Sequence, residues 1–257
     1  FVLNTTGDAT FVGSTVNVGG DAQLGVGGNL NLVAAVDSNY SYSKTKKSSW
    51  GGLSSSTDIV ANEAQYLSGA NVNVNDGLTI VSGKDTNIIG SNLSAGGDAN
   101  IFAGYKIGEN GLEKSGQAGS VNIAAGYETS KTYELHKSTS FLDNLDKAVG
   151  DVFSGDALKY SHGKFSSELE LGSQKSDEYT TTTTSAVASN LNVGGNLQIG
   201  ASENINLIGS NLSTNGSSIL SSDKNINITG ALNTQTTSNK HEDTTIKLTA
   251  SAGNTYV

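Results

Sequence analysis

The stretch Leu78-Thr-Ile-Val-Ser-Gly-Lys-Asp-Thr-Asn-Ile-Ile-Gly-Ser-Asn-Leu-Ser94 is the strongest indication of the fold, because a close copy of it occurs later in the chain. The copy is Leu197-Gln-Ile-Gly-Ala-Ser-Glu-Asn-Ile-Asn-Leu-Ile-Gly-Ser-Asn-Leu-Ser213, in which nine of the seventeen positions are identical. The two stretches begin 119 residues apart. A repeat of this length indicates a chain that is built from stacked copies of one structural unit.

A shorter period of about 21 residues lies within the long one. Ile80 and Ile101 are 21 residues apart, Ile123 follows 22 residues later, and Ile199 and Leu220 are again 21 apart. Each step holds two or three short apolar alternations, as strands with one buried face require. Gly, Asn and Ser between them suit tight bends. The spacing predicts an all-β fold, namely a right-handed parallel β-helix with about 21 residues per turn.

The composition agrees with a thin, repetitive core. Only 35% of the residues are hydrophobic and 6% are aromatic, whereas glycine accounts for 32 residues. We therefore expect residues 1–257 to form a single β-helix fragment. With no Met and no apolar signal segment at its start, the chain is expected to be an internal piece of a longer protein. The net charge of -9 and the absence of Arg disfavour nucleic-acid binding.

Three polar segments interrupt the repeat. They cover residues 36–68, 127–187 and 234–257, and each alternates Ser, Thr or Tyr with charged residues. This alternation is typical of an exposed strand, so we predict β-hairpin arms that project from the β-helix. The third arm is expected to be truncated.

The second arm contains one predicted short helix, near residues 140–153. Phe141 and Leu145 lie on its apolar face. Either this face is an amphipathic patch for a membrane or partner, or the helix is a small lid that packs on the rest of the chain. The first arm carries the aromatic residues Tyr40, Tyr42 and Trp50, which are candidates for contacting a sugar or a partner. Trp50 has the alternative role of pinning the hairpin tip.

No catalytic, cofactor-binding or metal site is predicted. The three histidines, His136, His162 and His241, are far apart in sequence, and acids such as Asp85 and Asp98 occur about once per step, at predicted corners. A polysaccharide lyase or hydrolase, the enzymes that this fold also hosts, needs clustered acids and bases instead. The absence of Cys excludes disulfides and thiolate metal sites.

The Asn-rich strands have two interpretations. In Asn71-Val-Asn-Val-Asn75 and Asn204-Ile-Asn-Leu207, Asn alternates with apolar residues. Asn side chains of successive turns can form amide ladders that stabilise the stack. Alternatively, outward amides can bind carbohydrate on a flat face.

The combination of motifs resembles a known family. Gly90-Ser-Asn-Leu-Ser-Ala-Gly-Gly-Asp-Ala-Asn-Ile-Phe-Ala-Gly104, together with polar arms that follow an Ala-Ala pair, is similar to the haemagglutinin repeats of filamentous-haemagglutinin-type exoproteins. The resemblance covers nearly all of the chain.

The resemblance implies a β-helix that Gram-negative bacteria export by two-partner secretion and display at the cell surface. It implies two kinds of parent protein: filamentous adhesins, and contact-dependent growth-inhibition effectors whose stalk carries a toxin. The expected partners are an outer-membrane transporter during export, and a target-cell outer membrane, surface receptor or glycan. Three roles remain open: a passive stalk, an adhesion or delivery module, and a carbohydrate-binding or polysaccharide-degrading β-helix.

Overall fold

The chain consists of β-strands that form two compact units. The computed structural model describes residues 1–49, 53–141, 158–161 and 164–253, and within these ranges all regular elements are strands. One unit comprises residues 1–38, 64–129 and 183–234. The other comprises residues 39–63, 130–182 and 235–257.

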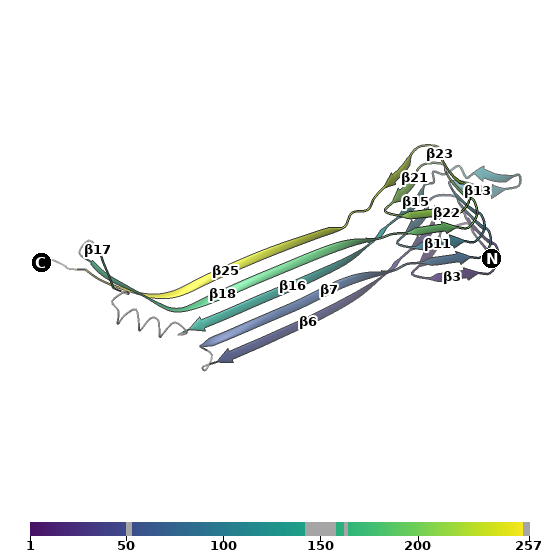
Figure 1. The fold of residues 1–257 in the computed structure, drawn as a ribbon. Coiled ribbons are helices and arrows are strands. Elements are labelled where there is room, and N and C mark those ends of the chain that lie inside the picture. Colours follow the sequence, from purple (N-terminus) through teal and green to yellow (C-terminus); the bar gives the residue numbers. More distant parts are fainter. Residues whose placement is uncertain (50–52, 142–157, 162–163, 254–257) are drawn as a thin grey trace. The chain divides into compact units, whose positions relative to one another are not determined.

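The first unit is a parallel β-helix with three sheets (Figure 1). Sheet 1 contains, in spatial order, β1 (Val2–Thr5), β4 (Ala22–Val26), β9 (Leu78–Ser82), β12 (Ala99–Ala103), β20 (Leu197–Ala201) and β23 (Ser218–Ser222). Sheet 2 contains β2 (Ala9–Val12), β5 (Leu30–Val33), β10 (Thr86–Ile89), β15 (Val121–Ala124), β21 (Ile205–Ile208) and β24 (Ile226–Thr229). Sheet 3 contains β3 (Thr15–Val18), β8 (Asn71–Val74), β11 (Asn92–Ala95), β19 (Asn190–Val193) and β22 (Asn211–Thr214).

Inward side chains of equivalent strands stack on one another and form the core. In sheet 1, Leu24 pairs with Ile80, Ile80 with Ile101, and Ile101 with Ile199, and all four are buried. Burying one such side chain stabilises the fold by about 1.5–3 kcal/mol. The predicted fold class is confirmed, and so are the 21-residue steps from Ile80 to Ile101 and from Ile199 to Leu220.

The predicted step from Ile101 to Ile123 is wrong. Ile123 lies in sheet 2, where it pairs with Ile88, whereas Ile101 belongs to sheet 1. An antiparallel hairpin, β13 (Tyr105–Gly108) and β14 (Gly111–Lys114), is inserted at the bend between β12 and β15. The insertion lengthens this turn, and the 22-residue spacing therefore does not correspond to a turn of the β-helix.

The bend between sheets 2 and 3 alternates between two forms. In every second turn it is a tight corner at Gly13, Gly90 or Gly209, with φ of 52°, 57° and 56°. This left-handed conformation favours glycine. In the turns between, the chain leaves the β-helix at this bend, after β5, β15 and β24.

The second unit is built on long strands that leave at these bends. They are β6 (Ala35–Ser49), β7 (Ser54–Ser68), β16 (Gly126–Phe141), β18 (Lys164–Val187) and β25 (Thr234–Gly253), with the short β17 (Leu158–Ser161). We call β6 and β7 the first arm, β16 to β18 the second and β25 the third.

The three arms pair with one another in a single sheet, the arm sheet (Figure 1). Its order is β6-β7-β16-β18, and β18 then pairs with both β17 and β25. Between β7 and β16, Asp58 contacts His136 and Gln65 contacts Thr129, so the residue numbers run in opposite directions and the strands are antiparallel. The first arm is therefore hydrogen-bonded to the second, and the second to the third.

The predicted helix near residues 140–153 is only partly described. Ser140 and Phe141, its expected first residues, are the last residues of strand β16, because the backbone N–H of Phe141 donates to the carbonyl of Leu53 at 2.8 Å. The remainder, including Leu145, lies outside the described residues. Trp50 also lies outside them.

Candidate interaction surfaces

The outward asparagines of the β-helix form hydrogen-bonded ladders. In sheet 2, Nδ2 of Asn87 donates to Oδ1 of Asn31 at 2.9 Å, and Nδ2 of Asn122 donates to Oδ1 of Asn87 at 2.8 Å. Asn206 and Asn227 continue the ladder at 2.7 and 2.8 Å. A second ladder, in sheet 3, joins Asn71, Asn92, Asn190 and Asn211. The ladder interpretation is thus confirmed, and these amides already bind one another.

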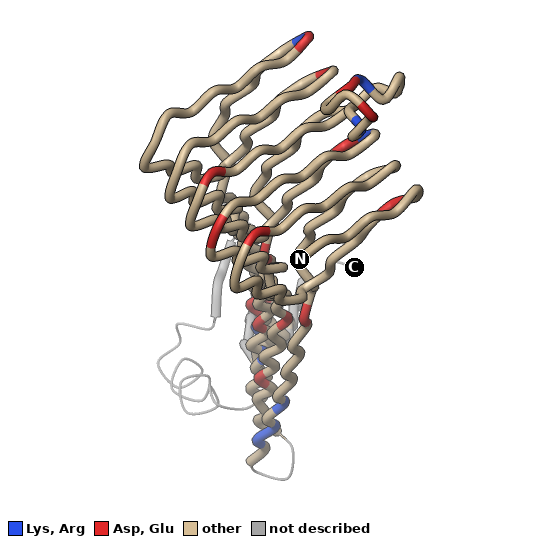
Figure 2. The backbone as a smooth tube through the Cα atoms, turned by 90° about the vertical axis from the view of Figure 1, so that its right-hand side faces the viewer, with Lys and Arg blue, Asp and Glu red and all other residues tan. Residues whose placement is uncertain are grey.

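The acids at the bends also have structural partners. Oδ1 of Asp85 accepts the backbone N–H of Ser120 at 2.8 Å, and Oδ1 of Asp98 accepts that of Asn196 at 2.6 Å. Figure 2 shows Asp and Glu at the bends between strands. Two further acids form ion pairs: Asp223 with Lys114, and Glu203 with Lys224. These carboxylates hold successive turns together instead of converging on one point.

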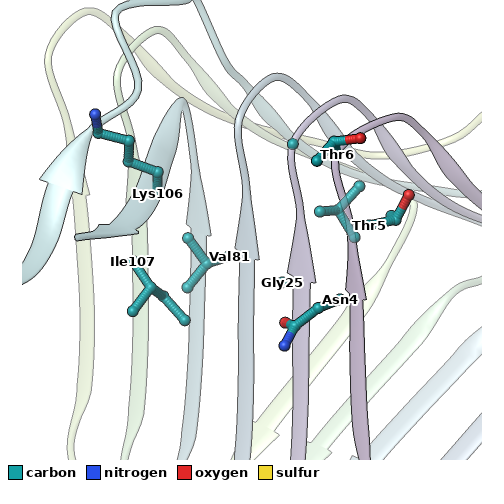
Figure 3. Close-up of a pocket in the computed structure, with 9 residues that line it drawn as sticks. Asn4, Thr5, Thr6, Gly25, Val81, Lys106 and Ile107 are labelled. Carbon is teal, nitrogen blue, oxygen red and sulfur yellow. The ribbon is translucent and has the colours of Figure 1, made fainter. Parts of the chain in front are cut away.

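Hairpin β13–β14 bounds a shallow groove on sheet 1 (Figure 3). The groove has a volume of about 530 Å³. Ile107 from β13 points toward Val81 of β9, and Asn4 of β1 lies on the other side. The floor includes Gly25, where any Cβ would overlap Oδ1 of Asn4. The sequence did not reveal this groove, because the inserted hairpin carries no motif that separates it from a bend.

The candidate aromatic residues of the first arm lie on the edge strand β6. The exposed fractions of Tyr40 and Tyr42 are 66% and 54%. Because alternate residues of a strand share a face, these side chains lie on one face together with Lys44 and Lys46, which are also exposed. Phe141 is half-buried at the end of β16. That these residues bind a partner stays a prediction.

A second pocket lies on the arm sheet near the ends of β6, β7 and β16. Its volume is about 490 Å³, and hydroxyl groups of serine and threonine line most of it. Lys47 and Lys175 also line it, and neither forms an ion pair with a described residue. The pocket therefore combines hydroxyl donors with positive charge.

The arm sheet also brings histidines and aspartates together across its strands. Nδ1 of His136 lies 2.9 Å from Oδ1 of Asp58, and Nδ1 of His241 forms a short hydrogen bond with Oδ1 of Asp177. Nε2 of His241 lies 3.0 Å from Oδ2 of Asp243. The hydrogen bond to Asp58 raises the pKa of His136, and the bonds to Asp177 and then Asp243 raise the pKa of His241. The sequence alone did not predict these pairs, because predicting them requires knowing how strands far apart in the chain pair with one another.

Two other kinds of site are not found in the described part of the chain. It has no group of three or more His, Cys, Asp or Glu side chains that could hold a metal ion. Nor does it contain a helix long and apolar enough to cross a membrane.

A stack of parallel strands with asparagine ladders, interrupted by paired arms, defines a β-solenoid repeat protein. The family model for the hemagglutinin repeat matches residues 1–52 and 171–256. The chain belongs to this family. The resemblance to filamentous-haemagglutinin-type exoproteins is thereby confirmed.

Curated relatives come from Burkholderia pseudomallei. The tRNA nuclease CdiA-2 of strain 1026b is 30% identical over an alignment 184 residues long, which covers 59% of this chain and 5% of that protein. A tRNA nuclease CdiA is 37% identical over an alignment 111 residues long, which covers 35% of this chain and 9% of the relative. The chain thus spans less than a tenth of either relative's length. No solved structure matches it significantly.

Proposed function

We propose that the chain is a non-enzymatic stalk and interaction segment of a large secreted exoprotein at the surface of a Gram-negative bacterium. In this proposal the β-helix is the stalk, and the arms at 36–68, 127–187 and 234–257 contact the target-cell envelope. Family membership and the CdiA relatives support this assignment. The nuclease activity in the relatives' names is that of much longer proteins.

One observation carries the choice of the arms as the contact surface. Strand β6 is exposed from Val36 to Ser49, and it presents Tyr40 and Tyr42 on the same face as Lys44 and Lys46. Tyrosine supplies a large contact area at low conformational cost, and lysine attracts anionic groups. In the β-helix, by contrast, the ladder amides bond to one another, and corner acids such as Asp85 accept backbone N–H groups of the next turn. We infer that the partner is an outer membrane, a surface receptor or a glycan of the target cell.

The test is binding of the purified chain to intact Gram-negative cells. We expect the double variant Tyr40→Ala/Tyr42→Ala to bind about tenfold more weakly, because exposed tyrosines in an interface commonly each contribute about 1 kcal/mol or more. Tyr66→Ala, at a tyrosine of β7 that is 53% exposed, is the matched control. Deleting residues 127–185 removes most of the second arm and should reduce binding further while circular dichroism remains β-rich. Equal binding by all variants, or no binding by the unaltered chain, would instead indicate a spacer.

The groove in Figure 3 supports a second candidate, a carbohydrate-binding or polysaccharide-degrading β-helix. Its polar rim and apolar floor suit a sugar ring. A screen of uronic-acid and neutral polysaccharides tests this candidate. It predicts binding or product formation that Ile107→Ala reduces and Ile89→Ala, at another exposed isoleucine, does not. The absence of both binding and products would exclude it.

A further inference from the structure

The histidine–aspartate pairs belong to one row that crosses the arm sheet. Asp58 of β7 contacts His136 of β16 at 2.9 Å, and Asp177 of β18 contacts His241 of β25. Both contacts join side chains of neighbouring antiparallel strands. The first bridges the first and second arms, and the second bridges the second and third arms.

The two pairs are neighbours on the same face of the sheet. Gly172 of β18 lies against Phe141 of β16. Counting from there along antiparallel strands places Asp177 opposite His136. One observation agrees with this register: the ring of Tyr179, two residues from Asp177, lies 6.5 Å from the ring of His136. The row therefore reads Asp-His-Asp-His over four successive strands.

The bonding of each histidine depends on its protonation. A neutral imidazole has one N–H donor and one lone pair, whereas a protonated imidazole has two donors. His241 faces Asp177 with Nδ1 and Asp243 with Nε2, so only the protonated ring can donate to both. The neutral ring would direct a lone pair at a carboxylate. At His136, Nδ1 faces Asp58, and Nε2 is 3.9 Å from Glu134.

We propose that this row is a pH-dependent ionic interaction between the arms, which is strong when both histidines are protonated and weak when they are neutral. It is independent of whether the arms bind a cell, and it concerns only how the arms hold one another. The interaction lies at the two junctions between separate arms, β7 with β16 and β18 with β25. These junctions are joined by backbone pairing and by exposed side chains, and the row adds one charged contact to each of them.

The groups around the row favour the protonated state. His136 faces Asp58 from β7, Glu134 from its own strand, and Asp177 and Tyr179 from β18. His241 faces Asp177 from β18 and Asp243 from its own strand. On β18, Lys175 lies two residues from Asp177.

The direction of the pH effect follows from these pKa shifts. The hydrogen bond to Asp58 raises the pKa of His136, and the bond to Asp177 raises that of His241. A histidine whose pKa is raised on folding contributes stability that is fully present below its unfolded pKa, about 6.5. That contribution is lost as the pH rises through the folded pKa. The arms should therefore hold together in mild acid and loosen in mild alkali.

The direct test is a pH titration of the histidine rings by NMR on the whole chain. We expect His136 and His241 to titrate above the usual histidine value. Asp58→Asn should lower the midpoint of His136 alone, whereas Asp177→Asn should lower that of His241 and also that of His136. Glu63→Gln is the matched control, because Glu63 lies on the other face of β7 and its loss should move neither midpoint.

Hydrogen exchange measures how stably the strands of neighbouring arms remain paired. After correction for intrinsic exchange, we expect amides of β7, β16, β18 and β25 to exchange about two- to fivefold faster at about pH 8.5 than at about pH 5.5, since exposed ion pairs have small effects. The difference should vanish in the Asp58→Asn/Asp177→Asn double variant. Ordinary midpoints for both rings, or a pH effect that the double variant retains, would overturn the proposal.

Discussion

Single residues at the bends are fixed by the turn above or below them. A Cβ at Gly83 would overlap the carbonyl oxygen of Gly27, and one at Gly96 would overlap that of Asn75. At these two positions the backbones of stacked bends therefore approach too closely for a side chain. The sequence predicts glycine-rich bends, because glycine suits tight turns. It does not identify the neighbouring carbonyl as the cause, because that contact joins residues on different turns.

The asparagine ladder makes a prediction at the same scale. Asn122 donates to Asn87 and accepts from Asn206, so Asn122→Ala leaves one acceptor and one donor without their partners. We expect the free energy of unfolding to fall by about 1–2 kcal/mol. Gln198→Ala, at an exposed outward position of β20, should change it by less than about 0.5 kcal/mol. Urea unfolding followed by circular dichroism measures both, and equal losses would show that the ladder adds no stability.

At the scale of the elements, the short strands could be predicted from the sequence. The strands with which they pair could be predicted only in part. Alternating apolar residues identify β9 and β20, because each buries one face. The pairing of β15 was mispredicted, since an inserted hairpin leaves no trace in that alternation. The arms show the same limit: Tyr40 and Tyr42 could be chosen from sequence as exposed aromatics. The His136–Asp58 contact could not, because it needs the register of two different arms.

The inserted hairpin is expected to be dispensable. Removing residues 105–118 would join Gly104 to Gly119, which are already close neighbours in the structure. The shortened bend would have three residues between β12 and β15, like the bend Gly83–Asp85 between β9 and β10. We therefore expect the thermal midpoint to change by no more than about 2–4 °C, the equivalent of roughly 1 kcal/mol. Residues 105–118 contribute only a few contacts to the rest of the unit, among them the exposed ion pair Lys114–Asp223, an edge-to-face ring contact between Tyr105 and Phe102, and a hydrogen bond from Oγ of Ser115 to the carbonyl of Gly83. A cooperative loss of structure on deletion would show that the hairpin closes the core.

At the scale of the whole chain, the spacing between successive arms along the β-helix matches the width of one arm. Arms leave the β-helix at every second turn, and stacked turns are spaced about 4.8 Å apart. A hairpin arm is two strands wide, and its strands have the same spacing. Successive arms therefore arrive at the separation that hydrogen bonding between them requires. This match explains why β7 pairs with β16 and β18 with β25, so that the inner edges of the arms are covered.

Changing the spacing between arms should separate them. A second copy of residues 71–91, inserted after Ser91, adds one turn without an arm between the first and second arms. The arms would then be three turns apart, leaving a gap one strand wide between β7 and β16. We expect amides of these strands to exchange at least about tenfold faster, and the exposed edges to cause concentration-dependent association in sedimentation. A copy of residues 1–21 placed before Phe1 adds a turn outside the arms and is the control. If β7 and β16 stayed protected in the first variant, the arms would pair independently of the β-helix period, and the two-turn spacing would have no structural role.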